Sequence, residues 1–397
     1  MASDDQVPLL ERAEMPDAPT IPKETAREIA LLEREFVEAE VQALRTSIPL
    51  LRPLFTRRNA LITSKLAQTD FWPRVFASAP PEIDNYILPS DAEIIRCLKN
   101  ITVERFSVND AGDAGEPRNV RFTFEFDTSP EENVWFGGDG KIVKEFYWRK
   151  TIGVSEKSGK RRVWEGLVSL PVRIPWRKAE VDPTKGLLDA ACDLAEAERK
   201  VGKGKKVTAE QRLELPEYEK LVTEVAKVEA EAHLHAECGE DGEGEGEHDH
   251  EHGDDSPAGM SFFAWFGYRG RDISAEESEE AVKADEEYWG KISRGEKVAG
   301  EEEKAGEAND DDDDNDDDDD DEDDDEDGLM DAEIFPDGDD LAIALSEDLW
   351  ENALNYYVQS FEEADAFDSD IDFDMDGMDD DDDDDEEVDR PRKKVKT

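Results

Sequence analysis

The chain has few of the residues from which active sites and cross-links are commonly built. Its 397 residues include three cysteines and five histidines. Cys97, Cys192 and Cys238 are odd in number, widely spaced and without a Cys-x-x-Cys pair, which indicates neither a disulfide framework nor a zinc site. All five histidines lie between residues 233 and 252, away from the strand-like part of the sequence. This placement excludes an acid–base histidine in the folded core.

Catalytic and membrane signatures are also missing. The sequence contains no Gly-x-x-x-x-Gly-Lys loop, no Gly-x-Ser-x-Gly elbow and no His-Glu-x-x-His pattern. No run approaches the 18 or so apolar residues of a membrane span, and no charged leader begins at Met1. Residues 248–252 alternate His with acids, but the flanking Gly and Glu are typical of a flexible loop rather than a preformed metal site. We therefore expect a soluble intracellular protein that is not an enzyme and has no catalytic residue, metal or cofactor.

Negative charge is present in large excess. The chain has 107 acidic and 47 basic residues, a formal net charge of −60. Residues 301–389 contain 47 of these acids and a single base, Lys304, whereas residues 1–300 contain 60 acids and 41 bases. Residues 310–327 are acidic at every position except Asn315 and cannot bury enough apolar surface to offset their own repulsion. Such an acidic tract predicts a partner that is strongly basic.

A basic run closes the sequence. Five bases fall within seven positions after the acidic run that ends at Glu387, and the last four positions of the run fit the Lys-Lys-x-Lys pattern of nuclear import signals. A simpler interpretation is a solvated end that folds back on its acidic neighbours. The pattern predicts a nuclear protein that shuttles with the cytoplasm, through Arg390, Arg392, Lys393, Lys394 and Lys396.

Residues 23 to 66 predict one long helix with a coiled-coil seam. Its apolar residues follow a 4-3 repeat, and a continuous helix would be about 65 Å long, more than one small domain can cover. We therefore expect the seam to bind a second copy. Pro49 and Pro53 predict a kink or break, and two ordinary helices packed on their own domain are the alternative. The predicted dimerisation residues are Val37, Val41, Leu44, Ile48, Leu51, Phe55 and Ile62.

Residues 101 to 174 change to a strand pattern. Four segments rich in β-branched and aromatic residues are separated by clusters of Gly, Pro, Asp and Asn, which favours an antiparallel meander. One face of the sheet, with Val120, Phe122, Phe124 and Phe126, should pack on helices, so the predicted fold class is α+β. The predicted strands are residues 101–108, 119–126, 142–150 and 162–174.

Two aromatic segments are predicted to be core rather than ligand platforms. The first is Phe262, Phe263, Trp265 and Phe266, a short apolar run between polar segments. In the second, a 4-3-4 spacing puts four apolar side chains on one face of a helix that should close the core of the sheet. These are Trp350, Leu354, Tyr357 and Phe361.

The same segments carry motifs that occur together in a known family. Arg52-Pro-Leu-Phe-Thr-Arg-Arg58 is followed by Phe71-Trp72, then by Ser261-Phe-Phe-Ala-Trp-Phe266, and finally by Asp348-Leu-Trp350 with Leu354-Asn-Tyr-Tyr357. In this order they resemble the nucleosome assembly protein family, in its SET-like branch. The resemblance covers most of residues 23–175, 260–267 and 341–361. It implies a histone chaperone that acts in chromatin, dimerises through the long helix and holds core histones beneath two α+β lobes.

Together these patterns divide the chain into eight parts. A charged insertion and an acidic loop placed before the Trp350 helix, rather than after it, depart from the family pattern, and the sequence does not indicate what the insertion does. The parts are a disordered N-terminus (1–22), the dimerisation helix (23–69), the α+β lobe (70–176), a partly helical charged insertion (177–258), an aromatic core segment with a charged helix (259–300), an acidic disordered loop (301–328), the C-terminal helix of the lobe (329–363) and an acidic tail with the basic run (364–397).

The predicted histone contacts are carboxylates of the lobe and of the acidic tracts. Histones bind DNA largely through Lys and Arg, so a negative surface would suppress non-productive binding to DNA. The rigid lobe would supply shape and the tracts would supply charge, with no sequence-specific nucleic-acid binding and no membrane partner. The lobe candidates are Glu131, Glu132, Asp139, Glu145, Asp348, Glu351, Glu362 and Glu363, and those of the tracts are Asp316, Asp323, Asp381 and Asp385.

Two other functions fit the same residues. Some fungal relatives in the family present histones to an acetyltransferase, and this cofactor role is the first alternative. A low-affinity calcium buffer would also use runs of carboxylates, because hard cations take oxygen ligands. It would normally need a lumenal signal, which makes it the weaker alternative.

Overall fold

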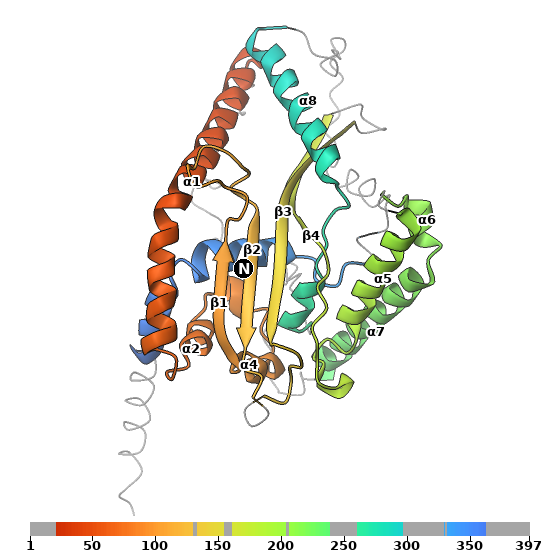
Figure 1. Ribbon diagram of the computed structural model, residues 1–397. Helices are drawn as coiled ribbons and strands as arrows, with labels where there is room; N and C mark the ends of the chain where they lie inside the picture. Colours follow the sequence, from red (N-terminus) through yellow and green to blue (C-terminus); the bar gives the residue numbers. More distant parts are fainter. Residues whose placement is uncertain are drawn as a thin grey trace, which may run out of the picture.

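A long helix and a four-stranded sheet lie side by side, and further helices enclose them (Figure 1). The computed structural model describes residues 21–129, 133–154, 161–203, 206–238, 260–296, 329 and 332–362. Helix α1 and helix α8 meet at one end of the molecule, and α5 to α7 lie beyond the opposite edge of the sheet. None of the described helices is long and apolar enough to cross a membrane.

Helix α1 spans Lys23–Lys65, which confirms the predicted long helix. The break predicted at its prolines is wrong, because Pro49 and Pro53 both lie inside the helix, whereas the kink stays a prediction. Two arginines that flank Pro49 fasten α1 to the lobe. Arg45 Nε donates to the Gly115 carbonyl at 2.9 Å, and Arg52 Nη2 donates to the Val108 carbonyl at 2.6 Å. These contacts tie the helix to the lobe on both sides of a position where a backbone donor is missing.

The sheet is an antiparallel meander, as predicted. Its strands are β1 (Leu98–Glu104), β2 (Val120–Phe126), β3 (Lys141–Val154) and β4 (Arg161–Ser169), in the order β1-β2-β3-β4. The predicted fourth strand extended to residue 174, but the chain leaves the sheet after Ser169, where Pro171 lacks a backbone donor. The fold class is α+β, with the sheet packed on helices.

Aromatic side chains fill one face of the sheet. Phe122 and Phe124 meet Trp265 edge-on, with ring centroids 5.2 and 6.1 Å apart, and Phe124 lies 5.3 Å from Phe266. Trp265 and Phe266 belong to the 3-10 helix η2 (Phe262–Gly267), in which every residue is buried. This confirms that the first aromatic segment is core. Edge-to-face pairs of this kind contribute about 0.5–1.5 kcal/mol each beyond the area that they bury.

One buried lysine joins β3 to the chain on either side of the insertion. Lys144 is fully buried, and its Nζ donates to the carbonyls of Leu170, Phe266 and Tyr268 at 3.0, 3.1 and 2.7 Å. Burial lowers the pKa of Lys144 to about 7. Three carbonyl acceptors satisfy all three donors of an ammonium group, which is the condition for burying it.

The insertion is packed on the lobe. It forms α5 (Leu187–Gly202), α6 (Ala209–Leu213) and α7 (Pro216–Cys238), and α5 packs on both α7 and η2. Buried ion pairs link α5 and α6 to the chain that follows η2. Glu198 accepts from Arg212 and from Arg269, both at 2.6 Å, and Arg212 also pairs with Asp272 at 2.5 Å.

The remaining helices surround the sheet. Helix α8 (Ala275–Ser293) begins with a capping box of Ser274 and Glu277 and packs across β3. The others are α2 (Phe71–Ala77), α3 (Pro81–Asp84), α4 (Pro89–Ile95), α9 (Gly338–Ile343), the π-helical η5 (Ala344–Leu349) and a helix over residues 353–362.

Candidate functional site

Two stretches without a basic residue meet on one side of the lobe. Residues 75–95 and residues 329–362 contain no Lys or Arg. The fold brings them together, because α3 packs against η5 and Tyr86 Oη donates to Asp337 Oδ2 at 3.2 Å. Carboxylates of both stretches therefore share one surface, and neither stretch contributes a basic side chain to it.

Trp350 anchors the second stretch to the lobe. Its ring stacks on Trp72 at 5.8 Å between centroids and lies 5.5 Å from the ring of Phe55. The Arg58 guanidinium lies over Trp350, 4.1 Å from the ring centroid, and Arg58 Nη1 donates to the Trp350 carbonyl. Burial lowers the pKa of Arg58 to about 10. The backbone next to Glu351 is therefore fixed by a cation that is itself almost completely covered.

We define the acidic surface as Glu82, Asp84, Asp337, Asp340 and Asp348. Glu82 and Asp84 are exposed on α3, and Asp340 is exposed on α9. Asp348 accepts hydrogen bonds from Asn352 Nδ2 and Tyr356 Oη, both at 2.8 Å. Burial, together with that bond and the charge of Asp348, raises the pKa of Tyr356 to about 12. Asp348 is thus held in a fixed position, as a selective contact requires.

Two more carboxylates border this surface. Glu347 forms an ion pair with Arg105 at 2.7 Å, which balances its charge. Burial raises the pKa of Glu351, and Arg105 and Arg58 oppose that rise. Glu362 is exposed at the end of the described part of its helix. The predicted contacts Asp348, Glu351 and Glu362 therefore all belong to the base-free second stretch.

The predicted contacts on the sheet lie elsewhere. Glu145 accepts from Arg121 Nε at 2.6 Å and from Tyr147 Oη, and these bonds, that of Tyr147 first, lower its pKa. Its charge is already balanced. Asp139 is exposed in the turn between β2 and β3, where it accepts from the Lys141 backbone.

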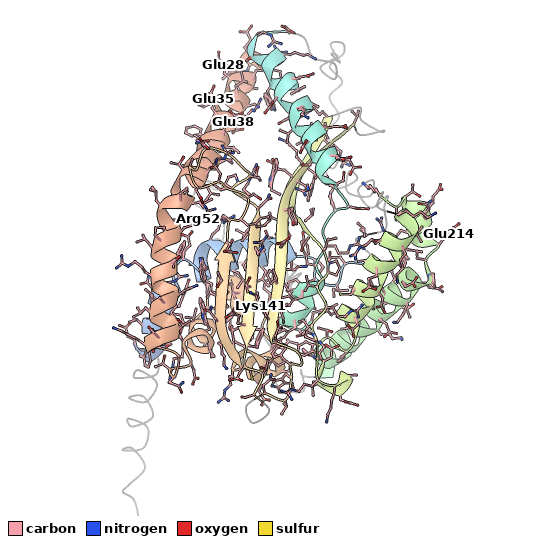
Figure 2. All side chains as sticks on the ribbon, in the orientation of Figure 1. Glu28, Glu35, Glu38, Arg52, Lys141 and Glu214 are labelled. Carbon is pink, nitrogen blue, oxygen red and sulfur yellow. The ribbon has the colours of Figure 1, made fainter. Side chains whose placement is uncertain are left out.

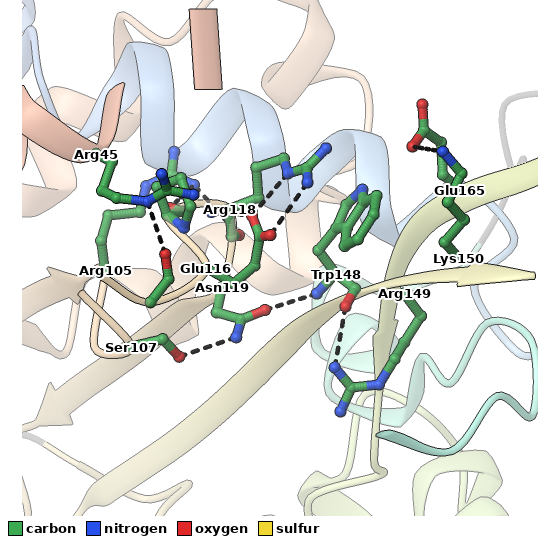
Figure 3. Close-up of polar contacts among 12 residues, drawn as sticks. Arg45, Arg105, Ser107, Glu116, Arg118, Asn119, Trp148, Arg149, Lys150 and Glu165 are labelled. Atoms are coloured by element: carbon green, nitrogen blue, oxygen red, sulfur yellow. Dashed lines mark hydrogen bonds and ion pairs between the residues drawn. The ribbon is translucent and has the colours of Figure 1, made fainter. Parts of the chain in front are cut away.

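Arginines and lysines pair the carboxylates along this side of the sheet (Figure 3). Arg118 Nε lies 2.7 Å from Glu116, and Lys150 Nζ lies 3.7 Å from Glu165. Asp285 of α8 pairs with both Lys150 and Arg161. The described carboxylates Glu116, Glu145, Glu165 and Asp285 beside the sheet thus each have a basic partner, whereas Glu82, Asp84 and Asp340 lie in stretches of sequence without Lys or Arg.

Several predicted residues lie outside the described part of the chain. They are Glu131, Glu132, Glu363, Asp316, Asp323, Asp381 and Asp385, with the basic run Arg390, Arg392, Lys393, Lys394 and Lys396. Conversely, the sequence analysis missed Glu82, Asp84, Asp337 and Asp340. The signal that could have found them is the absence of Lys and Arg from residues 75–95 and 329–362.

The second aromatic segment is only partly core. Trp350 is buried and Tyr357 is half-buried, with its ring 4.7 Å from Phe71. Leu354 and Phe361 are 39% and 42% exposed, so their assignment to the core-closing face is wrong. The buried positions are instead Ala353 and Ser360, where small side chains let the helix lie close to the lobe.

Most of the predicted dimer seam faces the protein's own lobe. Ile62 and Ile48 are 1% and 6% exposed, and Leu44, Leu51 and Phe55 line a groove between α1 and β1. Ile62 has no surface left for a second copy, and its place in the seam is wrong. Val37 is exposed and Val41 half-buried, and both line a hollow between α1 and α8.

Another face of α1 carries exposed apolar side chains. They share the helix surface with acids such as Glu28, Glu35 and Glu38, which Figure 2 shows along the end of α1 that meets α8. With residues 29, 36 and 50 at d positions, residues 54 and 61 fall at a positions of one heptad register, and residue 32 falls at the flanking g position. The residues of this exposed stripe are Ile29, Leu32, Phe36, Leu50, Leu54 and Leu61.

The described residues include no group of three or more His, Cys, Asp or Glu side chains placed to hold a metal ion. Cys192 is buried, and burial raises the pKa of its thiol to about 11. The acidic surface offers fixed carboxylates to a cationic partner, and this is the chemistry that its arrangement supports.

Similarity to known proteins is found in one curated sequence and in several solved structures. No family model matches the chain. A Schizosaccharomyces pombe protein named as a putative nucleosome assembly protein is 31% identical over 150 residues, which is 38% of this chain and 56% of the relative. The chain resembles a nucleosome assembly protein. It spans little more than half the length of that curated relative.

The nucleosome assembly resemblance predicted from the motifs is thus confirmed. Among solved structures, a Ccp1 mutant has a TM-score of 0.42 at 19% identity, covering 86% of this chain and 98% of its own. Another Ccp1 structure has a TM-score of 0.40 at 21% identity, with coverages of 85% and 95%. The Vps75 histone chaperone has a TM-score of 0.37 at 17% identity, with coverages of 84% and 97%.

Proposed function

We propose that this protein is a histone chaperone that binds core histones through the acidic surface and shields them from DNA during nucleosome assembly. The observation that carries the proposal is the meeting of two base-free stretches at α3 and η5. Carboxylates fixed at such a junction can contact Lys and Arg directly, whereas charges more than about 8 Å apart are screened at physiological salt. Similarity to a nucleosome assembly protein supports the choice of histones among basic partners.

The acidic tracts complement this surface. Residues 310–327 and 379–387 provide a dense negative field that accelerates capture of a cationic partner. The acidic surface provides carboxylates that contact the partner directly and in a defined geometry. Histone–DNA binding depends on the release of counterions and is strong at low salt. A chaperone of this design suppresses the non-specific part of that binding by competing for the same Lys and Arg.

The exposed stripe of α1 supports a homodimer. Its six apolar residues are exposed, and all but Leu32 fall at the a and d positions of one heptad register, as in a helix–helix seam. Replacing Leu50 and Leu54 with Asp places charges in that seam and should yield a monomer by sedimentation. The matched control replaces Val134 and Val154, which are exposed elsewhere, with Asp and should leave the dimer intact. Wild-type protein that sediments as a monomer at micromolar concentration contradicts the dimer.

The terminal basic run supports nuclear import with return to the cytoplasm. Replacing Lys393, Lys394 and Lys396 with Ala should reduce nuclear accumulation of a fluorescent fusion without changing the folded lobe. An unchanged nuclear signal shows that another element directs import.

The decisive test is a titration of fluorescently labelled core histones with the full-length protein, followed by competition with DNA. The protein should bind histones with an affinity that falls with salt and should release them from non-specific DNA complexes. Absence of binding at low salt would sink the proposal. An affinity pull-down from nuclear extract separates the alternatives, because a histone-presenting cofactor also retains an acetyltransferase and a calcium buffer retains neither.

A further inference from the structure

A groove runs between α1 and the first strand of the sheet. The edge groove, as we call it, has a volume of about 410 Å³. From β1 and its extension it is lined by five consecutive residues, 102 to 106. Successive side chains of a strand point to opposite faces, so an unbroken run of lining residues means that the strand edge itself faces the groove.

This edge of β1 is open in the described part of the chain. Within that part β1 pairs with β2 alone, because β1 is the first strand of the sheet order. The carbonyl of Arg105 faces α1, since it accepts from Arg52 Nη2 at 3.4 Å. In an antiparallel ladder the backbone groups of alternate residues point to the same side, which places those of Val103 and Ile101 at the open edge. Such an edge is a template for another strand.

The C-terminal sequence contains a segment with strict strand periodicity. Between residues 367 and 375 every even position is Asp, and the odd positions are Phe367, Ser369, Ile371, Phe373 and Met375. Alternation of apolar and polar residues over four to eight positions is typical of a half-buried strand, whereas a helix needs a period near 3.6.

The segment begins close to the edge groove. The described chain ends at Glu362, twelve residues after Trp350, which lines the groove. A helical stretch of twelve residues advances about 18 Å. Ile371 lies nine residues beyond Glu362 and can reach about 30 Å in an extended chain. The segment is therefore long enough to return along the helix and enter the groove.

The lining of the groove complements this segment. Leu51, Phe55 and Trp350 offer apolar contacts to the odd positions, and Arg52, Arg105 and Arg121 offer charge to the Asp positions. Arg121 and Arg105 have acidic neighbours, and Arg52 donates through Nη2 to two backbone carbonyls, while its printed carboxylate partner in the described chain, Asp110, is fully exposed. Asn59 Oδ1, in the same lining, is buried and accepts no hydrogen bond from the described residues. It is an acceptor placed where an added strand brings donors.

We propose that residues 367–375 add to the open edge of β1 in the edge groove of the same chain and form a fifth strand. The odd side chains cover Phe55 and Trp350, and the backbone of the segment pairs with Ile101 and Val103. Docking fixes the point from which residues 379–387 leave the lobe, so that the final acidic run starts beside α1 rather than at the end of a free tail.

Hydrogen exchange of the full-length protein tests the docking. Replacing Ile371 and Phe373 with Asp keeps the chain length and removes the apolar alternation. In wild type, the amides of Ile101, Val103 and residues 367–375 should exchange slowly, and in the variant both sets should exchange at least about tenfold faster. The amides of β3 should not change. The matched control replaces Gly377 and Met378 with Asp, which adds the same charge outside the alternation, and should exchange like wild type.

Three results would overturn the proposal. The first is fast exchange of residues 367–375 in wild type, and the second is equal protection of the Ile101 and Val103 amides in wild type and variant. The third concerns which copy provides the segment. A photo-crosslinker at position 373 should join the segment to α1 or β1 of its own chain when isotope-labelled and unlabelled copies are mixed. Crosslinks found only between copies, or only after histones are added, contradict docking within one chain.

Discussion

The carboxylates of the sheet side and those of the acidic surface differ in whether basic side chains accompany them. On the sheet side, Asp285 is surrounded by Lys150 and Arg161, and Glu145 by Arg121 and Tyr147. On the acidic surface, Glu82 and Asp340 lie in stretches that contain no base at all. The difference teaches that net charge does not locate a binding site in this chain. What distinguishes the acidic surface is that the two stretches that form it contribute acids and no Lys or Arg.

The largest expected effect comes from removing that support. Trp350→Ala deletes the ring that stacks on Trp72 and lies beneath Arg58, and it leaves the covered Arg58 cation with the Phe55 ring but without the nearer Trp350 ring. Loss of a buried aromatic residue costs about 3–5 kcal/mol. Urea unfolding should therefore show a large drop in stability, and histone binding should weaken as the helix over 353–362 detaches. Tyr147→Ala, on the sheet side, is the control, because its ring is half-buried and does not hold the acidic surface. If both variants lose the same histone affinity, Trp350 does not support the acidic surface specifically, and the two regions do not differ in this respect.

Charge reversal compares the two regions directly. Glu82→Lys, Asp84→Lys and Asp340→Lys together should weaken histone binding at least about tenfold, since exposed pairs contribute 0.2–1 kcal/mol each and reversal replaces attraction by repulsion. The matched set, Glu104→Lys, Glu116→Lys and Glu165→Lys, changes the same number of charges beside the sheet. It should have a clearly smaller effect in the same fluorescence titration. Equal weakening by both sets means that only net charge matters.

The pH dependence of stability should have opposite signs in the two regions. Burial alone would raise the pKa of Asp285, but hydrogen bonds from Lys150 and Arg161 outweigh it and lower that pKa. Its contribution is therefore present above the ordinary Asp pKa of 3.8 and is lost as pH falls through the lowered value. Asp285→Asn should destabilise the protein at neutral pH by about 1–3 kcal/mol, and the difference should disappear in acid.

Glu351 provides the opposite case. Burial raises its pKa, so its ionised form opposes folding above that raised value, and stability recovers as pH falls through it toward the ordinary Glu pKa of 4.5. Glu351→Gln should stabilise the protein slightly at neutral pH and have no effect in acid. Thermal unfolding over a pH series measures the stability of both variants. If both substitutions change stability at neutral pH with the same sign, the opposite pKa shifts assigned to Asp285 and Glu351 are wrong.

The smallest expected effect concerns the terminal acidic run. Deleting residues 379–387 removes nine acids that act mainly on capture rate and non-specific affinity. Histone affinity should fall modestly, and its salt dependence should become shallower. A tail deletion that abolishes binding while the triple reversal of the acidic surface has no effect would make the lobe an inert scaffold.

Local patterns predicted much of the fold. The aromatic strands alternate so regularly that the four-stranded meander follows from Phe122, Phe124 and their neighbours, and the long helix follows from its apolar spacing. The same spacing placed Ile62 in the predicted dimer seam, because α1 carries two apolar stripes and periodicity does not tell which one the lobe covers. Ile62 is in the core and Leu54 is exposed, although both look alike in sequence.

The acidic surface was harder to predict for a different reason. Asp348 could be selected because it precedes Trp350, but Glu82 lies far away in the chain and joins the surface only through the packing of α3 on η5. In a chain with so many carboxylates, an acid alone is not a signal. The contacts that balance Glu145 and leave Glu82 unbalanced exist only in the folded structure.

The covering of the sheet by η2 has a consequence for synthesis. Phe122, Phe124 and Phe146 are made more than a hundred residues before Trp265 and Phe266. At a synthesis rate of about 5–20 residues per second, the segment that covers their aromatic rings is made on the order of ten seconds later. Until then the nascent sheet exposes these aromatic side chains, and Lys144 lacks the Phe266 and Tyr268 carbonyls that accept hydrogen bonds from its Nζ. A nascent chain that ends within the insertion therefore lacks the segment that covers this face and exposes an aggregation-prone apolar surface.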